Sequence, residues 1–251
     1  MTEHLATPAH PAHIASRAAV IMAAAVFGLT YSLSAALIAI DLAEMGLDEV
    51  LIGANAAMHA VGVLVMAFLL PRLVSFLGMR RAVVTGLVSS ALLLLAFPAM
   101  PTFWLWFPLR VLLGAASEAL FVLSETWLNA LSSEKTRARA MGIYTAALSL
   151  GFALGPMILS FVGTDGATPY IAGAGLAAFA ALFILSPKVR APVVEKPAHG
   201  KTHQNERDRR HYANACAEKN RIAACLLISY YFYAINIVAY EIFSDTPQPY
   251  E

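Results

Sequence analysis

Long apolar runs alternate with short polar segments along most of this chain. The runs cover residues 18–40, 50–70, 82–100, 103–131, 140–162, 167–187 and 222–240. Each is close to the roughly 20 residues that a helix needs to cross the hydrocarbon core of a bilayer. Because backbone groups in hydrocarbon must satisfy their own hydrogen bonds, runs of this length are expected to be helices. The pattern predicts an all-α, polytopic membrane protein.

The composition supports membrane residence. The chain has 251 residues, of which 59% are hydrophobic and only 13% are charged, and its mean hydropathy is +0.66. A soluble domain carries about 25% charged residues. Residues 1–17 form a polar N-terminal tail, and residues 18–40 follow without any charge. That run is longer than the apolar core of a signal peptide, so we interpret it as a retained first span.

The positions of lysine and arginine predict the orientation. Of the 17 such residues, only Arg110 lies inside a run; the others lie in residues 1–17, 71–81, 132–139 and 188–221. No lysine or arginine occurs in the remaining connections at 41–49, 101–102 and 163–166. Since cytoplasmic loops are enriched in basic residues, every second connection is predicted to be cytoplasmic. The N-terminus is therefore expected on the cytoplasmic side of the membrane, and six spans return the chain to that side.

Several function classes are excluded by what the chain contains. A net charge of +1, without a basic stripe and interleaved aromatics, argues against nucleic-acid binding. No nucleophile–base or metal-ligand constellation occurs, so we expect neither an enzyme nor a cofactor. Residues 188–221 are polar and charged, which is typical of a flexible cytoplasmic linker. Residues 222–240 are then a seventh span, and 241–251 form a short tail without lysine or arginine.

The fifth run carries an unusual spacing of helix-weakening residues. Gly142, Gly151, Gly155 and Pro156 all lie within it. Small residues let membrane helices approach closely, and a proline permits a bend. Gly151 and Gly155 share a face and Gly142 lies roughly opposite, so this helix is expected to pack on two sides. The spacing also resembles the fifth-span motif of antiporters in the major facilitator superfamily, whose final Gly-Gly pair is replaced here by Leu159 and Ser160.

Two further segments resemble motifs of the same superfamily. The loop "PRLVSFLGMRR" matches its loop motif at Gly78, Arg80 and Arg81, whereas Pro71, Ser75 and Phe76 replace a glycine, an aspartate and a basic residue. Gly78 permits a tight turn, and the arginines can hold helix C-termini or anionic headgroups. A plain positive-inside loop is the alternative. In the fourth run, Arg110 and Gly114 look like the Arg-x-x-x-Gly motif of the family.

The fourth run also carries two carboxylates on the face of that motif. Arg110, Gly114, Glu118 and Glu125 fall within about 80° on a helical wheel. Charges inside a membrane are costly and usually face a cavity or pair with one another. Glu118 is two turns from Arg110, so its partner must come from another span or from water. We interpret the stripe as lining a cavity, with Glu118 or Glu125 carrying a proton or binding a cation. Alternatively, Arg110 and Glu125 lie near the two membrane faces and reach water there.

The first two spans add polar residues to this picture. Asn55 and His59 are one turn apart on span two, and Tyr31, Ser32 and Ser34 add polarity to span one. An imidazole can titrate near neutral pH, although His59 can equally be a hydrogen-bonded packing residue. We expect these side chains and Tyr31 to line the same solute and proton pathway. The segment "LSETWLNAL" is similar to a bacterial branch of the superfamily that has a glutamate at this place.

The resemblance covers residues 18–187, which correspond to the N-terminal six-helix bundle of a twelve-span transporter with two six-span halves. It implies secondary transport of a small solute or drug-like molecule, coupled to protons and in the direction of antiport or efflux. Partners would be the bilayer, the solute, protons, and a missing C-terminal half or a second copy in a homodimer. The abrupt change of composition near residue 190 suggests a truncated or frame-shifted gene product, with a genuine linker and span as the alternative. An inactive membrane fragment and a membrane sensor or assembly subunit are the rival interpretations.

Overall fold

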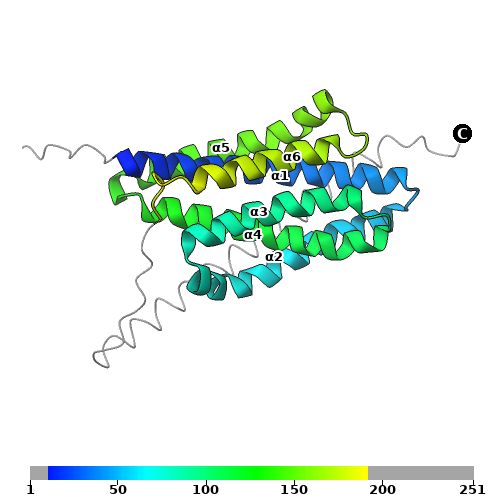
Figure 1. Ribbon diagram of the computed structural model, residues 1–251, viewed down its shortest axis with the longest axis horizontal. Helices are drawn as coiled ribbons and strands as arrows, with labels where there is room; N and C mark the ends of the chain where they lie inside the picture. Colours follow the sequence, from blue (N-terminus) through cyan, green and yellow to red (C-terminus); the bar gives the residue numbers. More distant parts are fainter. Residues whose placement is uncertain (1–10, 192–251) are drawn as a thin grey trace, which may run out of the picture. The chain divides into compact units, whose positions relative to one another are not determined.

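The structure, a computed structural model, describes residues 11–191 and shows a bundle of helices there (Figure 1). The first ten residues, the linker beyond Ala191, the predicted seventh span at 222–240 and the tail at 241–251 lie outside the described residues. The elements are α1 (Pro11–Glu44), α2 (Glu49–Leu77), α3 (Met79–Ala99), the short 3-10 helix η1 (Phe103–Leu105), α4 (Trp106–Ala130), α5 (Glu134–Val162) and α6 (Thr168–Ile184). The all-α class predicted from the apolar runs is confirmed.

The helices differ from the apolar runs mainly at their ends. α1 begins at Pro11, so residues 11–17 of the predicted tail are helical, and α2 continues through Pro71 to Leu77. The apolar runs end where polar residues begin, but a helix can continue into water because its backbone bonds are internal. The predicted fourth span starts with η1 and only then becomes α4. Among the described helices, α1 to α5 are long and apolar enough to cross a membrane, whereas α6 is shorter, with 17 residues.

The turns between helices are set by single residues. Asp48 precedes α2 and its carboxylate accepts a hydrogen bond of 2.9 Å from the backbone N–H of Leu51, which caps the helix. Gly78 separates α2 from α3 with a φ of +77°, a conformation that residues with a side chain rarely adopt. The tight turn predicted at Gly78 is therefore present.

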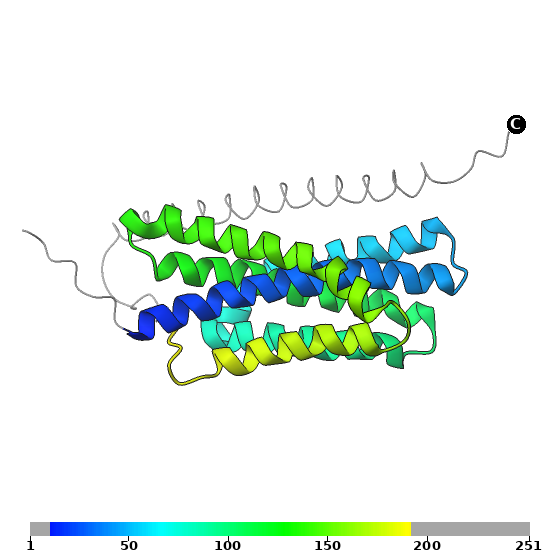
Figure 2. The same cartoon turned by 90° about the horizontal axis from the view of Figure 1, so that it is seen from above.

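The bundle is built from three main helix pairs. α1 packs most extensively against α5, α2 against α4, and α3 against α6, while α4 also packs on α3 and α1. Figure 2 shows α1 running between α5 and α6. Consequently α1 and α4 have the most buried apolar segments, and α2 and α5 are mostly exposed.

Glycines allow two of these pairs to bring their backbones together. A side chain on Gly151 would overlap the carbonyl oxygen of Ala25 on α1, and one on Gly114 of α4 would overlap the carbonyl oxygen of His59 on α2. Gly155 likewise faces Ser32. At Gly142 the structure differs from the prediction, because no described atom outside its own stretch of helix lies within 4 Å of the place of a side chain. α5 thus packs closely on one side of the described bundle, rather than on two.

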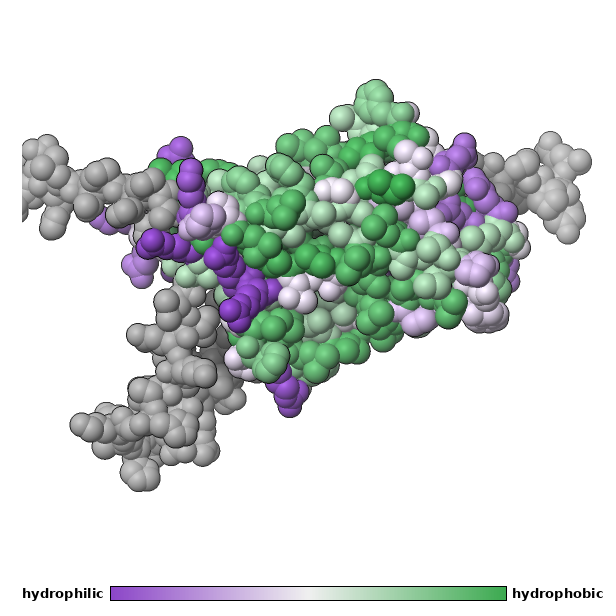
Figure 3. All heavy atoms as spheres, viewed as in Figure 1, coloured by the Kyte–Doolittle hydropathy of each residue, from purple (hydrophilic) through white to green (hydrophobic). Residues whose placement is uncertain are grey.

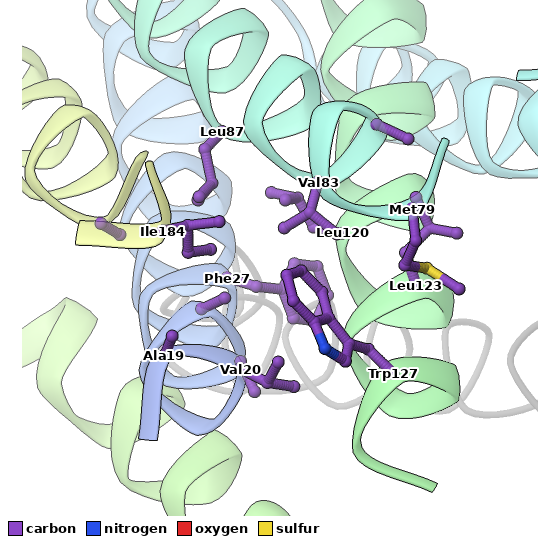
Figure 4. Close-up of a cluster of buried hydrophobic side chains, with 14 of the residues drawn as sticks. Ala19, Val20, Phe27, Met79, Val83, Leu87, Leu120, Leu123, Trp127 and Ile184 are labelled. Carbon is purple, nitrogen blue, oxygen red and sulfur yellow. The ribbon is translucent and has the colours of Figure 1, made fainter. Parts of the chain in front are cut away.

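Large apolar side chains fill the interior between the helices. Figure 4 shows one such cluster, in which Phe27, Val83, Leu120, Trp127 and Ile184 meet from four helices. The outside of the bundle is also apolar: Phe68 is 78% exposed and Phe161 is 81% exposed. Figure 3 shows this apolar surface between two ends that carry hydrophilic residues. A broad apolar exterior of this kind fits contact with lipid.

Candidate functional site

The polar stripe predicted on α4 is enclosed by the bundle. Arg110 is 4% exposed, Glu118 is 8% exposed, and Gly114 between them is buried against α2. Glu125 is only partly buried. With a rise of about 1.5 Å per residue, Arg110 and Glu118 are separated by about 12 Å along the helix axis. Arg110 lies close to the start of α4, and Glu118 lies near the middle of the helix.

Arg110 lies among groups from several helices. Its Nη1 donates a hydrogen bond of 3.5 Å to the backbone carbonyl of Ser34 on α1. Its guanidinium also interacts electrostatically with His59 of α2 and Tyr170 of α6. The close approach at Gly114 explains the first of these neighbours, since it brings the His59 backbone against α4. Arg110 is therefore a junction between helices inside the bundle, not a side chain at its surface.

The structure also brings together the other polar residues predicted for this region. Asn55 and His59 are each 1% exposed on α2. The His59 ring meets the Tyr31 ring edge-on, with 5.2 Å between ring centroids. The side-chain nitrogen Nδ2 of Asn55 is buried and has no hydrogen-bond partner within residues 11–191. An amide donor buried without an acceptor is costly, so this nitrogen is a notable feature of the site.

An aromatic cluster beside Tyr31 was not predicted. The Tyr31 ring lies edge-on to Phe152 of α5 at 5.5 Å, and Phe27 lies 5.7 Å from Phe121 of α4, measured between ring centroids. Tyr31, Phe121 and Phe152 are all half-buried. Single aromatics within apolar runs carry no signal in the sequence that they will meet. Their meeting depends on the contact of α1 with α5, which Gly151 and Gly155 make close.

Glu118 stands apart from these contacts. It makes no hydrogen bond and no ion pair with any residue in the described part of the chain. The partner that we expected from another span is therefore not found among residues 11–191. A carboxyl group buried without a partner is costly when it is charged, and binding a proton or a cation removes that cost.

Glu125 has a different neighbourhood from Glu118. It interacts electrostatically with Tyr144 of α5, a buried residue that the sequence analysis did not single out. The Tyr144 hydroxyl lies 3.0 Å from the Ser124 hydroxyl and donates to the carbonyl of Phe121 at 3.3 Å. These bonds join α4 to α5 near the partly buried Glu125, well away from Arg110.

The arginines of the loop motif have separate environments. Arg80 donates from Nε to the carbonyl of Ile184 at 3.1 Å and from Nη2 to that of Ser186 at 2.9 Å, so it caps the C-terminus of α6. Arg81 is exposed and makes no hydrogen bond with a described residue. A second cap was not predicted: Arg17 Nη2 donates to the carbonyl of Leu131 at 2.6 Å, at the end of α4. In the sequence, Arg17 stands directly before an apolar run. That position indicated a cytoplasmic basic segment, but it did not indicate a contact with the end of α4.

A hydrogen bond near the opposite ends of these helices was also missed. The Tyr170 hydroxyl at the start of α6 donates to Asp41 of α1 at 2.6 Å. The Tyr170 ring is fully buried and stacks on Phe97 of α3, with 6.2 Å between ring centroids. The contact ties α1, α3 and α6 together. In the sequence, Asp41 directly follows an apolar run. That position indicated a loop, but it did not indicate a hydrogen bond to another helix.

Comparisons with known proteins agree with the motifs. The family model described as Major Facilitator Superfamily matches residues 20–247, and so extends beyond the described residues through the predicted linker and seventh span. A relative in Bacillus subtilis (strain 168), the uncharacterized MFS-type transporter YfkF, is 27% identical over 164 residues. The alignment covers 65% of this chain and 42% of the relative, so the chain spans less than half the length of the curated relative that it matches. With the family match covering most of its length, the chain belongs to the Major Facilitator Superfamily.

Proposed function

We propose that this chain forms one six-helix half of a secondary transporter in a bacterial inner membrane, and that Glu118 binds the proton that drives transport. The family and the relative described as an MFS-type transporter support transport in general. The observation that carries the proton site is the buried Glu118, which has no partner among the described residues and lies near the middle of α4.

The coupling follows from the cost of burying charge. When the site opens to water, Glu118 can release its proton because water solvates the carboxylate. When the site closes, the charged form is expensive, so closure favours the protonated carboxyl. If the site opens alternately to the two sides of the membrane, each cycle then carries a proton across. The fifth-span spacing of Gly142, Gly151 and Gly155-Pro156 supports the exchange of this proton against an exported solute, which is our proposal for the direction.

A flux measurement on the full chain tests this proposal. We would reconstitute the chain in liposomes, impose a pH gradient, and follow the movement of ethidium as a drug-like probe. Glu118→Gln keeps the shape but cannot release a proton. We therefore expect gradient-driven movement to fall to the level of protein-free liposomes, while exchange of ethidium without a gradient continues. Glu134→Gln is the matched control, because Glu134 is exposed at the start of α5.

The remaining outcomes decide against parts of the proposal. If Glu118→Gln and Glu134→Gln move ethidium equally well with the gradient, Glu118 is not the coupling site. If the unaltered chain moves nothing, infrared difference spectra on acidification still report whether Glu118 binds a proton. A carboxyl difference spectrum that is the same in Glu118→Gln as in the unaltered chain would contradict the assignment, because the band from Glu118 would then be missing from both. A soluble protein that co-purifies through residues 188–221, together with absent transport, would favour the sensor interpretation.

A further inference from the structure

The neighbouring helices α3 and α6 both expose apolar side chains on the outside of the bundle. The two helices pack side by side (Figure 1). Val88 and Leu92 on α3 are 42% and 62% exposed. Phe179 and Leu182 on α6 are 61% and 69% exposed. Exposed apolar side chains gathered in this way are suited to contact with the acyl chains of lipids.

Arg81 continues the exposed face of α3 to the start of that helix. It lies seven residues before Val88 and eleven before Leu92, so the three side chains fall within about 40° on a helical wheel. Arg81 is itself exposed and lies about 10 Å along the helix axis from Val88. A cation that follows an apolar face in this order matches a phospholipid, in which a charged headgroup follows the acyl chains.

The cap on α6 brings a second cation to the same place. Arg80, the neighbour of Arg81, donates hydrogen bonds to the carbonyls of Ile184 and Ser186. These bonds hold the C-terminus of α6 at the first turn of α3. Lys188 is exposed and lies two residues after Ser186. We call the place where Arg81 and Lys188 meet the α3–α6 corner.

Within residues 11–191, no acid offsets the two charges of the α3–α6 corner. The side chains of Arg81 and Lys188 form no ion pair and no hydrogen bond with a described residue. The first turn of α3 and the last turn of α6 carry no acidic residue. By contrast, Lys135 and Arg137 at the start of α5 follow the acid Glu134. Since like charges repel, an anion that binds both cations of the corner is favoured there.

We propose that the α3–α6 corner binds the phosphate of an anionic phospholipid, whose acyl chains lie on the exposed faces of α3 and α6. Arg81 and Lys188 supply the positive charge. A zwitterionic lipid carries its own cation and is therefore attracted less strongly to this pair. A free phosphate ion has the charge but no acyl chains. The lipid site does not rest on the proposed transport, because it lies outside the stripe on α4.

Lipid binding to the purified full chain tests this site. Native mass spectrometry would count the lipids that the chain retains during titration with phosphatidylglycerol, or with phosphatidylcholine of the same acyl chains. We expect phosphatidylglycerol to bind more tightly. A basic residue near an anionic lipid surface contributes about fivefold to binding, so the double variant Arg81→Gln, Lys188→Gln should bind phosphatidylglycerol about 25-fold more weakly. Its binding of phosphatidylcholine should not change.

The double variant Lys135→Gln, Arg137→Gln is the matched control. It removes the same amount of charge from two exposed side chains at the start of α5. We expect it to bind phosphatidylglycerol as tightly as the unaltered chain does. Because all four altered side chains are exposed, circular dichroism should show the same helix content in both double variants.

The other outcomes overturn the inference. Equal binding of the two lipids by the unaltered chain, or phosphatidylglycerol binding unchanged in Arg81→Gln, Lys188→Gln, would remove the anionic lipid site. Equal weakening in both double variants would show a general effect of charge and would overturn the α3–α6 corner as the site. Displacement of phosphatidylglycerol by an equal concentration of inorganic phosphate would show a site for the free ion and would overturn the lipid.

Discussion

At the scale of single residues, the glycines of α5 differ in what surrounds them. Gly151 faces the backbone of α1, where an added side chain would overlap the carbonyl oxygen of Ala25 and meet the Leu29 nitrogen at 3.0 Å. Backbone atoms cannot rotate away as a side chain can. In a membrane, where close packing replaces the hydrophobic effect between helices, this contact contributes directly to association of α1 with α5.

We predict that Gly151→Leu destabilises the bundle, because the added side chain must push α1 and α5 apart. Overpacking of a close contact typically costs about 1–3 kcal/mol, and backbone atoms place this case at the upper end. Gly142→Leu is the control on the same helix, since no described atom outside its own stretch of helix lies within 4 Å of its side-chain position. A leucine there improves helix propensity by up to about 1 kcal/mol. Thermal unfolding of the purified variants would measure both effects, and equal loss of stability would contradict this account.

The sequence indicates small residues at both positions but cannot rank them. Spacing alone places Gly151 and Gly155 on one face and Gly142 on another. Which face meets a neighbour depends on how α1 lies against α5, and that is decided by the packing of the whole bundle. The same limit applies to the site. The stripe of Arg110 and Glu118 follows from helical periodicity, whereas the meeting of His59 with Tyr31 depends on contacts between helices.

At the scale of helices, arginines satisfy two of the helix ends. The last carbonyl groups of a helix have no partner within it, and the helix dipole makes this end attractive to a cation. Arg80 at the start of α3 bonds carbonyls of Ile184 and Ser186 just at the end of α6, and Arg17 in α1 bonds that of Leu131 at the end of α4. The apolar runs predicted where the helices lie. They did not predict these contacts, because a basic residue beside a run indicates orientation and not a partner.

We predict that Arg80→Gln loosens the end of α6, because two bonds to its carbonyls are lost. Interactions of a cation with a helix C-terminus contribute about 0.3–1 kcal/mol, and up to about 2 when partly buried. Hydrogen exchange should become faster at the amides of Ser186 and Val189, which bond back to Phe183 and Ser186. Arg81→Gln is the neighbouring control, since Arg81 is exposed and bonds no described residue. If exchange became equally fast in both variants, the loss of a positive charge would explain the effect. The cap on α6 would then not be its cause.

At the scale of the whole bundle, charge separates the two ends of the described helices. Arg72, Arg81 and Lys135 are exposed near the connections from α2 to α3 and from α4 to α5. Exposed acids lie at the other connections, namely Glu44, Asp48 and Glu49 between α1 and α2 and Asp165 between α5 and α6. The hydrophilic ends flank the apolar surface in Figure 3. Basic residues near membrane helices favour the cytoplasmic side, so we propose that the basic end faces the cytoplasm.

Cysteine labelling in bacterial spheroplasts tests this orientation. Cys216→Ser and Cys225→Ser would first remove the two native cysteines, and Ser133→Cys or Asp165→Cys would then be added singly. Ser133 precedes α5 at the basic end and Asp165 lies before α6 at the acidic end, and both are exposed. A membrane-impermeant maleimide should label Asp165→Cys in intact spheroplasts and Ser133→Cys only after permeabilisation. The reverse labelling pattern would place the basic end outside the cell and would contradict this orientation. In each step of the proposed cycle, Glu118 would then exchange its proton with the side of the membrane opposite to the one expected here.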